Sequence, residues 1–277
     1  MSVRDPTSSV GDGLALATQG LRRSFGDFVA VDGIDLAVPE GSFYGFLGPN
    51  GAGKSTTIKC LTGLLRPSAG SVRILGLDPE SEPVAVKRRV GVVPEDLALF
   101  DRLTGAENLA FVARVHGLER ATFERRAAEL LELLELTDAA AALAADYSHG
   151  MRKKLSLAMA LLPSPRLLFL DEPFEGIDAV SSRLVKRFLL EFTGRGGTVF
   201  LTSHVLEIVE RLADHVGILH KGRLVAQGPI AELRTQREGA EGGQGGSRSA
   251  SSLEDLFLGI VGASAHAGEP ALEWLGA

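Results

Sequence analysis

The sequence of 277 residues has a single cysteine, Cys60, and no long run of apolar residues. One thiol cannot form an intramolecular disulfide or a metal site built of several cysteines, which excludes disulfide scaffolds and zinc clusters of that kind. The simplest role for Cys60 is that of a small buried hydrophobic residue. No stretch approaches the roughly 18 apolar residues of a membrane-spanning helix, and the polar, flexible N-terminus at residues 1–13 lacks a signal-type apolar core. We therefore expect a cytoplasmic protein that does not cross a membrane.

Basic residues are also too few for a positively charged surface. Lys and Arg together number 29 against 35 Asp and Glu, which gives a formal net charge of −6. The sequence as a whole is not basic and does not indicate nucleic acid as the main partner, so we expect no nucleic acid partner. The 45% hydrophobic and 23% charged residues instead describe an ordinary globular chain of one large domain or two modest ones.

Apolar runs predict strands on both sides of a helical stretch. Residues 14–38 form two alternating runs around Gly26-Asp27, which predicts an antiparallel hairpin. A second hairpin is predicted where residues 216–220 and 223–228 flank the turn Lys221-Gly222. Compact apolar runs predict further strands at 43–47, 71–75, 89–93, 167–171 and 198–204.

Between Pro94 and the strand at 167–171 the pattern is helical. Thr104 and Glu107 have the spacing of a capping box, in which each side chain satisfies the other's free backbone N–H. A second helix is expected from about Met151 to Leu162. A further helical face is formed by Ala127, Leu130, Leu131 and Leu134. The order of sheet, helical insert at about 96–162 and sheet again predicts an α/β fold.

The composition changes after about residue 235. Residues 236–252 are rich in glycine and serine and predict a flexible linker. In the C-terminal segment 253–277, one helical face carries Leu253, Leu256, Phe257 and Ile260. This face favours packing back on its own domain, and the alternative is a docking helix for a second subunit.

The motif with the clearest chemistry is the run Gly48-Pro49-Asn50-Gly51-Ala52-Gly53-Lys54-Ser55, which satisfies GxxxxGK[ST] between a strand and a helix expected to reach residue 65. The glycines allow backbone N–H groups to surround phosphate oxygens, and the helix N-terminus adds partial positive charge. Lys54 would bring a full charge to the β and γ phosphates, Ser55 would ligate Mg²⁺, and the adjoining Thr56 belongs to the same nucleotide-binding segment. An incidental glycine-rich turn is disfavoured by this context.

Two carboxylates follow the apolar strand at 167–171. Asp171 would hold the water shell of Mg²⁺. Glu172, which points the other way from a strand end, would polarise the attacking water as general base. A solvated strand-end charge is the alternative for Glu172 taken alone. With the phosphate-binding loop, the pair predicts hydrolysis of a nucleoside triphosphate.

Three further segments resemble those of ATP-binding cassette (ABC) proteins. Residues 147–152 (Tyr-Ser-His-Gly-Met-Arg) resemble the family's signature segment, 174–178 resemble its D-loop, and 202–204 resemble its switch-histidine loop. Their order and spacing match from about residue 14 to 233. The resemblance implies an ABC ATPase domain at 14–235, with a P-loop NTPase (RecA-like) core, an N-terminal antiparallel β subdomain and an inserted α-helical subdomain.

The resemblance also implies roles for single residues. Phe25 would stack on the adenine of ATP, and His204 would contact the γ-phosphate. Ser148 and the Gly150 N–H would act on ATP held by the opposite subunit, with Asp178 across the dimer seam. Hydrolysis would then require a second ATP-binding subunit, and the complete motifs favour a homodimer. Without the resemblance, Phe25 could be a core residue and residues 147–150 a polar loop that caps a helix.

Some positions depart from the commonest family pattern. Glu95 stands where glutamine is usual, and its carboxylate can still reach Mg²⁺ or its water. His149 and Met151 replace glycine and glutamine in the signature segment, which Tyr147 opens. These variants, with Pro-Glu-Asp at 94–96 and the segment at 252–262, resemble type-two exporter ATPases. This resemblance implies an ATPase on the cytoplasmic face of the membrane that drives a separate permease, in export, and it does not specify the transported substrate.

The permease could dock on the loop after Glu95. Leu97, Leu99 and Phe100 lie there near two aspartates, and the alternative is that they fill the domain's own core. A different class of function is a soluble ABC ATPase that acts on ribosomes or nucleic acid, which usually has coiled-coil arms, a zinc hook or a second cassette. A P-loop kinase or GTPase is the other alternative, and the guanine-reading NKxD motif is absent.

Overall fold

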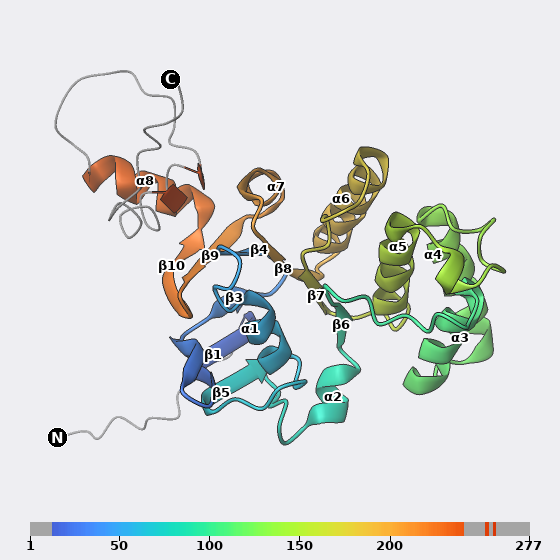
Figure 1. The fold of residues 1–277 in the computed structure, drawn as a ribbon, viewed down its shortest axis with the longest axis horizontal. Coiled ribbons are helices and arrows are strands. Elements are labelled where there is room, and N and C mark those ends of the chain that lie inside the picture. The colour runs from blue at the N-terminus through green and yellow to red at the C-terminus, as the bar shows by residue number, and fades with distance from the viewer. Residues whose placement is uncertain (1–12, 241–252, 255–256, 259–277) are drawn as a thin grey trace, which may run out of the picture.

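The computed structural model describes residues 13–240, 253–254 and 257–258 (Figure 1). The strands are β1 (Leu14–Phe25), β2 (Phe28–Ile34), β3 (Ala37–Pro39), β4 (Phe43–Leu47), β5 (Ala69–Ile74), β6 (Val90–Val93), β7 (Leu167–Asp171), β8 (Thr198–Ser203), β9 (His215–His220) and β10 (Arg223–Pro229). The helices are α1 (Lys54–Leu61), α2 (Pro83–Lys87), α3 (Gly105–His116), α4 (Arg120–Leu133), α5 (His149–Leu161), α6 (Ala179–Gly194), α7 (Leu206–Leu212) and α8 (Ile230–Ala240).

The larger sheet has the strand order β10-β9-β4-β8-β7-β6. The strands from β9 to β6 pair in parallel, and β10 pairs antiparallel with β9. In this sheet β4 and β7 are buried along their whole length. Burial on both faces explains their continuous apolar sequences, because helices or a second sheet must cover each face of a parallel sheet.

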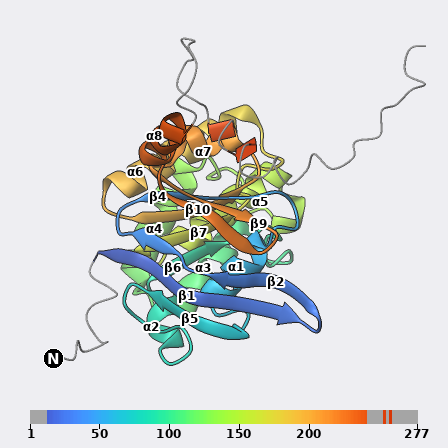
Figure 2. The same ribbon diagram turned by 90° about the vertical axis from the view of Figure 1, so that its left-hand side faces the viewer.

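The second sheet is antiparallel and four-stranded, with β1 paired to β2, β3 and β5. Figure 2 shows β1 between β2 and β5, below the larger sheet. The hairpin of β1 and β2 turns between Phe25 and Phe28, where Gly26 has a φ of 57°. A positive φ suits glycine at such a turn, which is why the Gly26-Asp27 pair predicts it.

Two hydrophobic clusters lie on opposite faces of the larger sheet, because side chains alternate along each strand. Phe43 and Leu47 of β4 belong to a cluster that includes residues of α3 to α7. Tyr44 and Phe46 belong to the other cluster, which includes residues of α1 and the antiparallel sheet. The sheet is thus the middle layer of the domain, and its strand ends are held rigidly from both sides.

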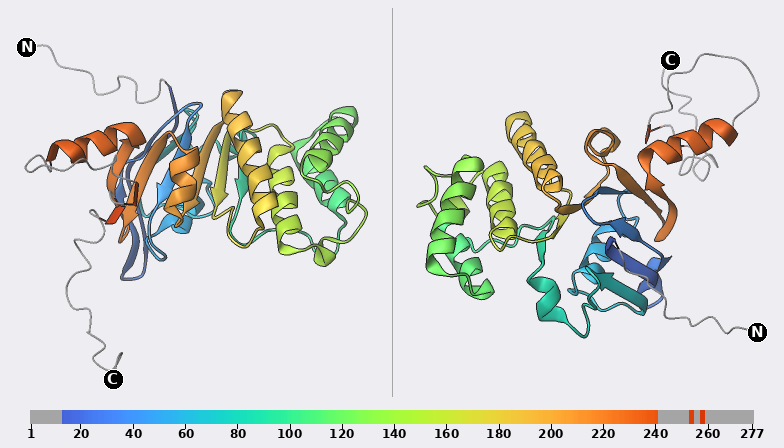
Figure 3. Two further views of the ribbon diagram at one scale, coloured as in Figure 1. Left: turned by 90° about the horizontal axis from the view of Figure 1, so that it is seen from above. Right: turned by 180° about the vertical axis from the view of Figure 1, so that it is seen from behind.

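Between β6 and β7 the chain forms α3, α4, a short 3-10 turn (Ala144–Asp146) and α5. Figure 3 shows these helices, coloured green to yellow, at one end of the molecule, with α8 at the other. The capping box that begins α3 is present: Glu107 N donates to Thr104 Oγ1 at 3.2 Å, and Thr104 N donates to Glu107 Oε2 at 2.8 Å. The hydrogen bond from the Thr104 backbone, with a smaller contribution from the Thr104 side chain, lowers the pKa of the Glu107 carboxyl.

Most predicted elements are confirmed, including both hairpins, and several bounds differ. α1 ends at Leu61 rather than near residue 65, because the chain turns at Gly63, whose φ is 73°. α5 begins at His149, two residues before the predicted start. The predicted linker is wrong at residues 236–240, which continue α8. The rest of the linker, residues 1–12 and most of the C-terminal segment lie outside the described residues.

The described part of the C-terminal segment packs on its own domain. Leu253 is buried, and its backbone N–H donates to Glu210 Oε1 at 3.1 Å. Phe257 packs against the hydrophobic cluster that includes residues of α3 to α7. Packing back on the domain is therefore confirmed for these two side chains. Leu256 and Ile260 lie outside the described residues.

Candidate nucleotide site

Several loops of the candidate site leave the larger sheet at the same edge. Because β4, β6, β7 and β8 are parallel, their carboxyl ends lie together, and open α/β sheets bind ligands at that edge. A cavity of about 370 Å³ lies there. It is lined by Phe28, Ala30, Asn50, Gly51, Gly53, Lys54, Ser55, Thr56, Glu95, Glu172, Glu175 and His204. The topology thus gathers residues that are far apart in the sequence.

The glycine-rich loop after β4 requires glycine at particular positions. Gly53 has a φ of 109°, and a Cβ there would lie 2.4 Å from the Ala30 carbonyl oxygen. A Cβ on Gly48 would lie 2.5 Å from the Leu219 carbonyl oxygen. No side chain caps the start of α1 at Gly53. The free N–H groups of its first turn therefore face a site suited to an anion.

Lys54, Glu172 and His204 lie together at the cavity. Lys54 Nζ lies 3.4 Å from Glu172 Oε1, and His204 Nδ1 lies 3.1 Å from Glu172 Oε2. Lys54 Nζ also donates to the Gly48 carbonyl at 2.8 Å. Lys54 and Glu172 are each 7% exposed. A buried ion pair of this kind holds a carboxylate in a fixed position between an ammonium and an imidazole.

Asp171 lies beside this group but does not line the cavity. It is buried, and its Oδ1 accepts a hydrogen bond from Thr202 Oγ1 at 2.6 Å. Thr202 Oγ1 in turn accepts from Glu172 N at 3.1 Å. Thr202 of β8 therefore links the two consecutive acidic residues at the end of β7 and orients both.

Ser55 and Glu95 provide further oxygen atoms at the cavity. Ser55 Oγ donates to Glu95 Oε2 at 3.4 Å, and both residues line the cavity. Hydroxyl and carboxylate oxygens are the ligands that Mg²⁺ prefers, and the ion commonly completes its shell with water and phosphate oxygens. In the described part of the chain, no group of three or more His, Cys, Asp and Glu forms a metal site by itself. The donor set fits Mg²⁺ held jointly with a phosphate ligand.

The structure places Ser148, Gly150 and Asp178 away from this cavity. Ser148 caps α5 by accepting from Met151 N, and Asp178 caps α6 by accepting from Val180 N and Ser181 N. The backbone hydrogen bond from Ser181 is the main cause that lowers the pKa of Asp178. The two helix starts are neighbours, since a Cβ on Gly150 would lie 3.7 Å from Asp178 Oδ2.

An aromatic residue outside the sequence motifs lines the cavity. Phe28 is 66% exposed and belongs to the lining, whereas Phe25 does not. Phe25 instead has the Arg23 guanidinium 4.5 Å above its ring. The two phenylalanines pair directly across the hairpin, so the signal for Phe28 was its position just after the Gly26-Asp27 turn. Ala30 and Glu175 were also not anticipated.

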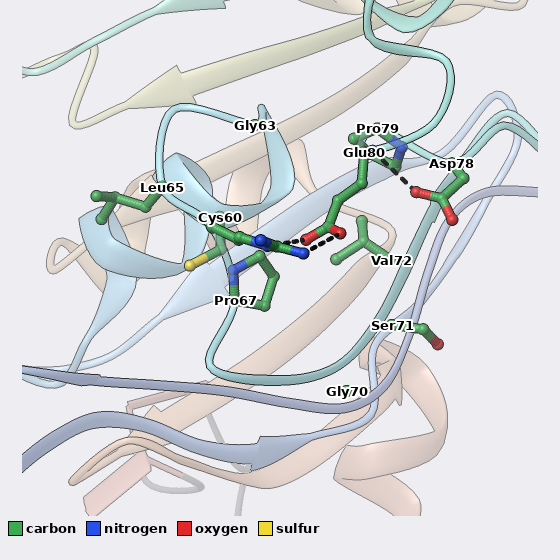
Figure 4. A pocket seen from close by; sticks show the side chains of 11 residues that line it. Cys60, Gly63, Leu65, Pro67, Gly70, Ser71, Val72, Asp78, Pro79 and Glu80 are labelled. Atoms are coloured by element: carbon green, nitrogen blue, oxygen red, sulfur yellow. Dashed lines mark hydrogen bonds and ion pairs between the residues drawn. The ribbon is translucent and has the colours of Figure 1, made fainter.

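A second cavity, of about 400 Å³, lies beyond the C-terminal end of α1 (Figure 4). Arg66 and Glu80 form an ion pair at its rim, with Nε and Oε1 3.3 Å apart. Cys60 is buried at its wall, and burial raises the pKa of the thiol. The packing confirms Cys60 as a buried side chain, and the raised pKa disfavours a reactive thiolate.

The fold and the cavity define a nucleotide-binding protein with a P-loop. A family profile described as ABC transporter matches residues 31–175. The "Daunorubicin/doxorubicin resistance ATP-binding protein DrrA" of Streptomyces peucetius is 43% identical over 80% of this chain and 67% of that protein. The linearmycin resistance ATP-binding protein LnrL of Bacillus subtilis is 34% identical over 91% of this chain and 80% of that protein. The chain belongs to the ABC transporter family.

Relatives named for export and solved structures agree with this assignment. The "Nod factor export ATP-binding protein I" of Ralstonia nicotianae is 37% identical over 85% of this chain and 74% of that protein. The solved ATP-binding subunit of an ABC transporter, 31% identical, covers 89% of this chain and 99% of its own, with a TM-score of 0.80. A bacterial cassette described as dimeric, 22% identical, shares the fold over 78% of this chain and 98% of its own, with a TM-score of 0.71.

These relatives confirm the α/β P-loop fold and the function predicted from the motifs. The chain is the ATP-binding, ATP-hydrolysing subunit of an ABC transporter. Among the residues that the structure describes, no helix is both long enough and apolar enough to span a bilayer.

Proposed function

We propose that two copies of this chain bind MgATP between them and drive export through a separate membrane permease, on whose cytoplasmic side they rest. The observation that carries the proposal is the buried Glu172 carboxylate, held between Lys54 and His204 beside the glycine-rich loop. A base, a phosphate-binding cation and a polar group for the γ-phosphate are there within one cavity. The names of the relatives support an organic molecule of the antibiotic or Nod factor kind as the exported substrate.

Lys54 and the first turn of α1 would bind the phosphates of ATP. Lys54 Nζ now contacts the Gly48 carbonyl and Glu172, and phosphate oxygens would replace these acceptors. A phosphate oxygen carries negative charge and attracts the Lys54 ammonium more strongly than the neutral Gly48 carbonyl does, which favours the exchange at that carbonyl. Phe28 offers its exposed ring for stacking on the adenine, a role that the family resemblance implies for Phe25 instead.

Ser55, Glu95 and Asp171 would hold Mg²⁺, the first two by the oxygen atoms that line the cavity. When bound, the ion neutralises charge on the β and γ phosphates. Asp171 is oriented by Thr202 and lies outside the lining, so it would act on the ion through water.

Glu172 would act as general base. Its carboxylate takes a proton from a water whose oxygen forms the new bond to the γ-phosphorus, while the bond from that phosphorus to the bridging oxygen of ADP breaks. His204 Nδ1 lies 3.1 Å from Glu172 Oε2, and the His204 ring would contact both the carboxylate and the γ-phosphate and fix their relative positions.

The dimer is supported by the residues that do not reach the chain's own cavity. Ser148 and Asp178 are exposed at neighbouring helix starts, outside the lining. Side chains placed there contact a nucleotide only if another chain presents it. Asp178 would then lie at the seam between the two chains.

Sedimentation of Glu172→Gln protein with and without MgATP tests the dimer. We expect the mass to double with MgATP, and the added substitution Ser148→Arg to prevent the doubling by crowding the opposite phosphate site. An exposed control, Val84→Asp on α2, should dimerise normally. A monomer that binds ATP at every protein concentration would contradict the proposal.

The permease would dock on an aromatic pair formed by one residue of α3 and one of the loop before it. Phe100 and Phe111 are 44% and 43% exposed, and their ring centroids are 4.5 Å apart. Leu97 and Leu99, which were candidates for the same surface, pack against the core instead. Exposed aromatic residues commonly anchor protein interfaces. Phe100→Asp with Phe111→Asp should abolish permease binding and leave basal ATP turnover intact, whereas Val84→Asp should change neither.

A further inference from the structure

Lys153 is a buried charged residue that the proposed mechanism does not use. It lies in the second turn of α5, is 8% exposed, and directs its ammonium away from solvent. Lys153 Nζ donates to the Glu172 carbonyl at 2.9 Å and to the Glu175 carbonyl at 2.5 Å. Burial lowers the pKa of Lys153, and the neighbouring carboxylates of Glu175, Glu172 and Glu95 oppose that shift.

The two carbonyls belong to a turn that needs support. Glu172 has a φ of 48°, in the left-handed region that a residue with a Cβ adopts only at a cost. The turn has one internal hydrogen bond to the Glu172 carbonyl, from Glu175 N at 3.3 Å. Lys153 adds a charged donor to the same oxygen and joins it to the Glu175 carbonyl, three residues further along the chain. The ammonium therefore favours the backbone conformation in which Glu172 is found.

That backbone conformation sets where the Glu172 side chain points. With its N–H bound to Thr202 Oγ1 and its carbonyl bound to Lys153 Nζ, the residue is fixed on both sides of its Cα. The carboxylate then extends between Lys54 and His204. A change in the turn would move the carboxylate while leaving the glycine-rich loop in place.

Lys153 also joins this turn to the start of α5. The helix begins at the Ser148 cap, and its first turn contacts the same loop, since a Cβ on Gly176 would lie 3.0 Å from the His149 ring. The hydrogen bond from Lys153 Nζ thus connects the helix that begins at Ser148 directly to the backbone of Glu172.

We propose that Lys153 is a positioning residue for hydrolysis, which holds the Glu172 carboxylate in place and transmits movement of α5 to it. This inference rests on the proposed role of Glu172 as general base. Lys153 does not line the cavity, and it acts only through the backbone of the turn.

The test compares Lys153→Met with a matched control, Lys154→Met. Lys154 is the next residue on α5, is equally buried, and pairs with Glu135 at 3.2 Å instead of reaching the turn. We expect Lys153→Met to lower kcat by about 10- to 100-fold, because small misplacements of a reacting group cost that much. ATP affinity should be unchanged. Lys154→Met should keep the wild-type kcat, and Lys153→Arg, which keeps charged donors, should recover much of the loss.

Two results would overturn the inference: a kcat for Lys153→Met equal to that of Lys154→Met, or a loss of ATP affinity that accounts for the whole loss of activity. If Lys153→Met does not fold, Lys153→Gln provides the same comparison with a shorter donor. Glu172→Gln is measured in parallel, and adding Lys153→Met to it should lower kcat no further. Wild-type turnover by Glu172→Gln alone would refute the role of Glu172 itself, whatever Lys153→Met shows.

Discussion

Replacing Glu172 by glutamine should separate binding of ATP from its hydrolysis. The substitution keeps the size, the backbone conformation and a hydrogen-bonding oxygen, and it removes the base. Loss of a general base costs about 10²- to 10⁴-fold in rate, so kcat should fall by that factor. ATP binding should not weaken with it. At the 3.4 Å that separates Lys54 Nζ from Glu172 Oε1, Coulomb's law gives an attraction of about 5 kcal/mol for an effective dielectric constant near 20. The phosphates of ATP compete with that attraction, so glutamine should leave ATP affinity equal or higher.

The assay combines phosphate release at saturating MgATP with titration calorimetry of ATP binding. Glu207→Gln is a suitable control, because Glu207 is an exposed carboxylate on α7 that pairs with Arg211 at 2.7 Å. The control should match wild type in both measurements. Wild-type phosphate release by Glu172→Gln would refute the reasoning. A large loss of ATP affinity in that variant would show that the carboxylate supports the phosphate site instead of competing with it.

Three further predictions concern single side chains. Lys54→Ala should weaken ATP binding about 10- to 150-fold, the equivalent of the roughly 1.5–3 kcal/mol of a hydrogen bond to a charged group, as measured by calorimetry; unchanged affinity would contradict its placement. Phe28→Ala should weaken ATP binding by the ~1–3 kcal/mol of a base–aromatic stack, and Phe25→Ala should not; the reverse order in a nucleotide titration would restore Phe25 as the adenine contact. Thr104→Ala removes the cap of α3 and should lower the free energy of unfolding by about 0.5–2 kcal/mol in urea denaturation, with ATP turnover unchanged.

Local patterns predicted the parts of the fold that depend on local chemistry. The turn at Gly26, the capping box at Thr104 and the glycine-rich loop before Lys54 each need particular residues at fixed positions, so the sequence reveals them. The helix α6 was not predicted, although Asp178 at its start is a good N-cap and Val185 and Leu189 lie four residues apart on its buried side. The structure shows which apolar residues of α6 face the larger sheet, and this makes the helical pattern easy to recognise.

The candidate site was predictable residue by residue where motifs name its members. The contacts between those members were not, because they depend on strand order. The pairing of Asp171 with Thr202 follows from β7 lying beside β8, and the cavity position of Phe28 follows from how the hairpin bends over the glycine-rich loop. Lys153 has no motif that points to Glu172, since its bonds go to backbone carbonyls that any residue would supply.

The central claim, that this ATPase drives a membrane permease, is tested most directly by co-purification from membranes. Tagged Glu172→Gln protein, expressed in its native cell and held with MgATP, is recovered after detergent solubilisation, and mass spectrometry identifies the chains that remain bound. We predict a polytopic membrane protein in stoichiometric amount, and its loss from the Phe100→Asp, Phe111→Asp variant. Recovery from the soluble fraction alone, with ribosomes or nucleic acid attached, would contradict the account of transport.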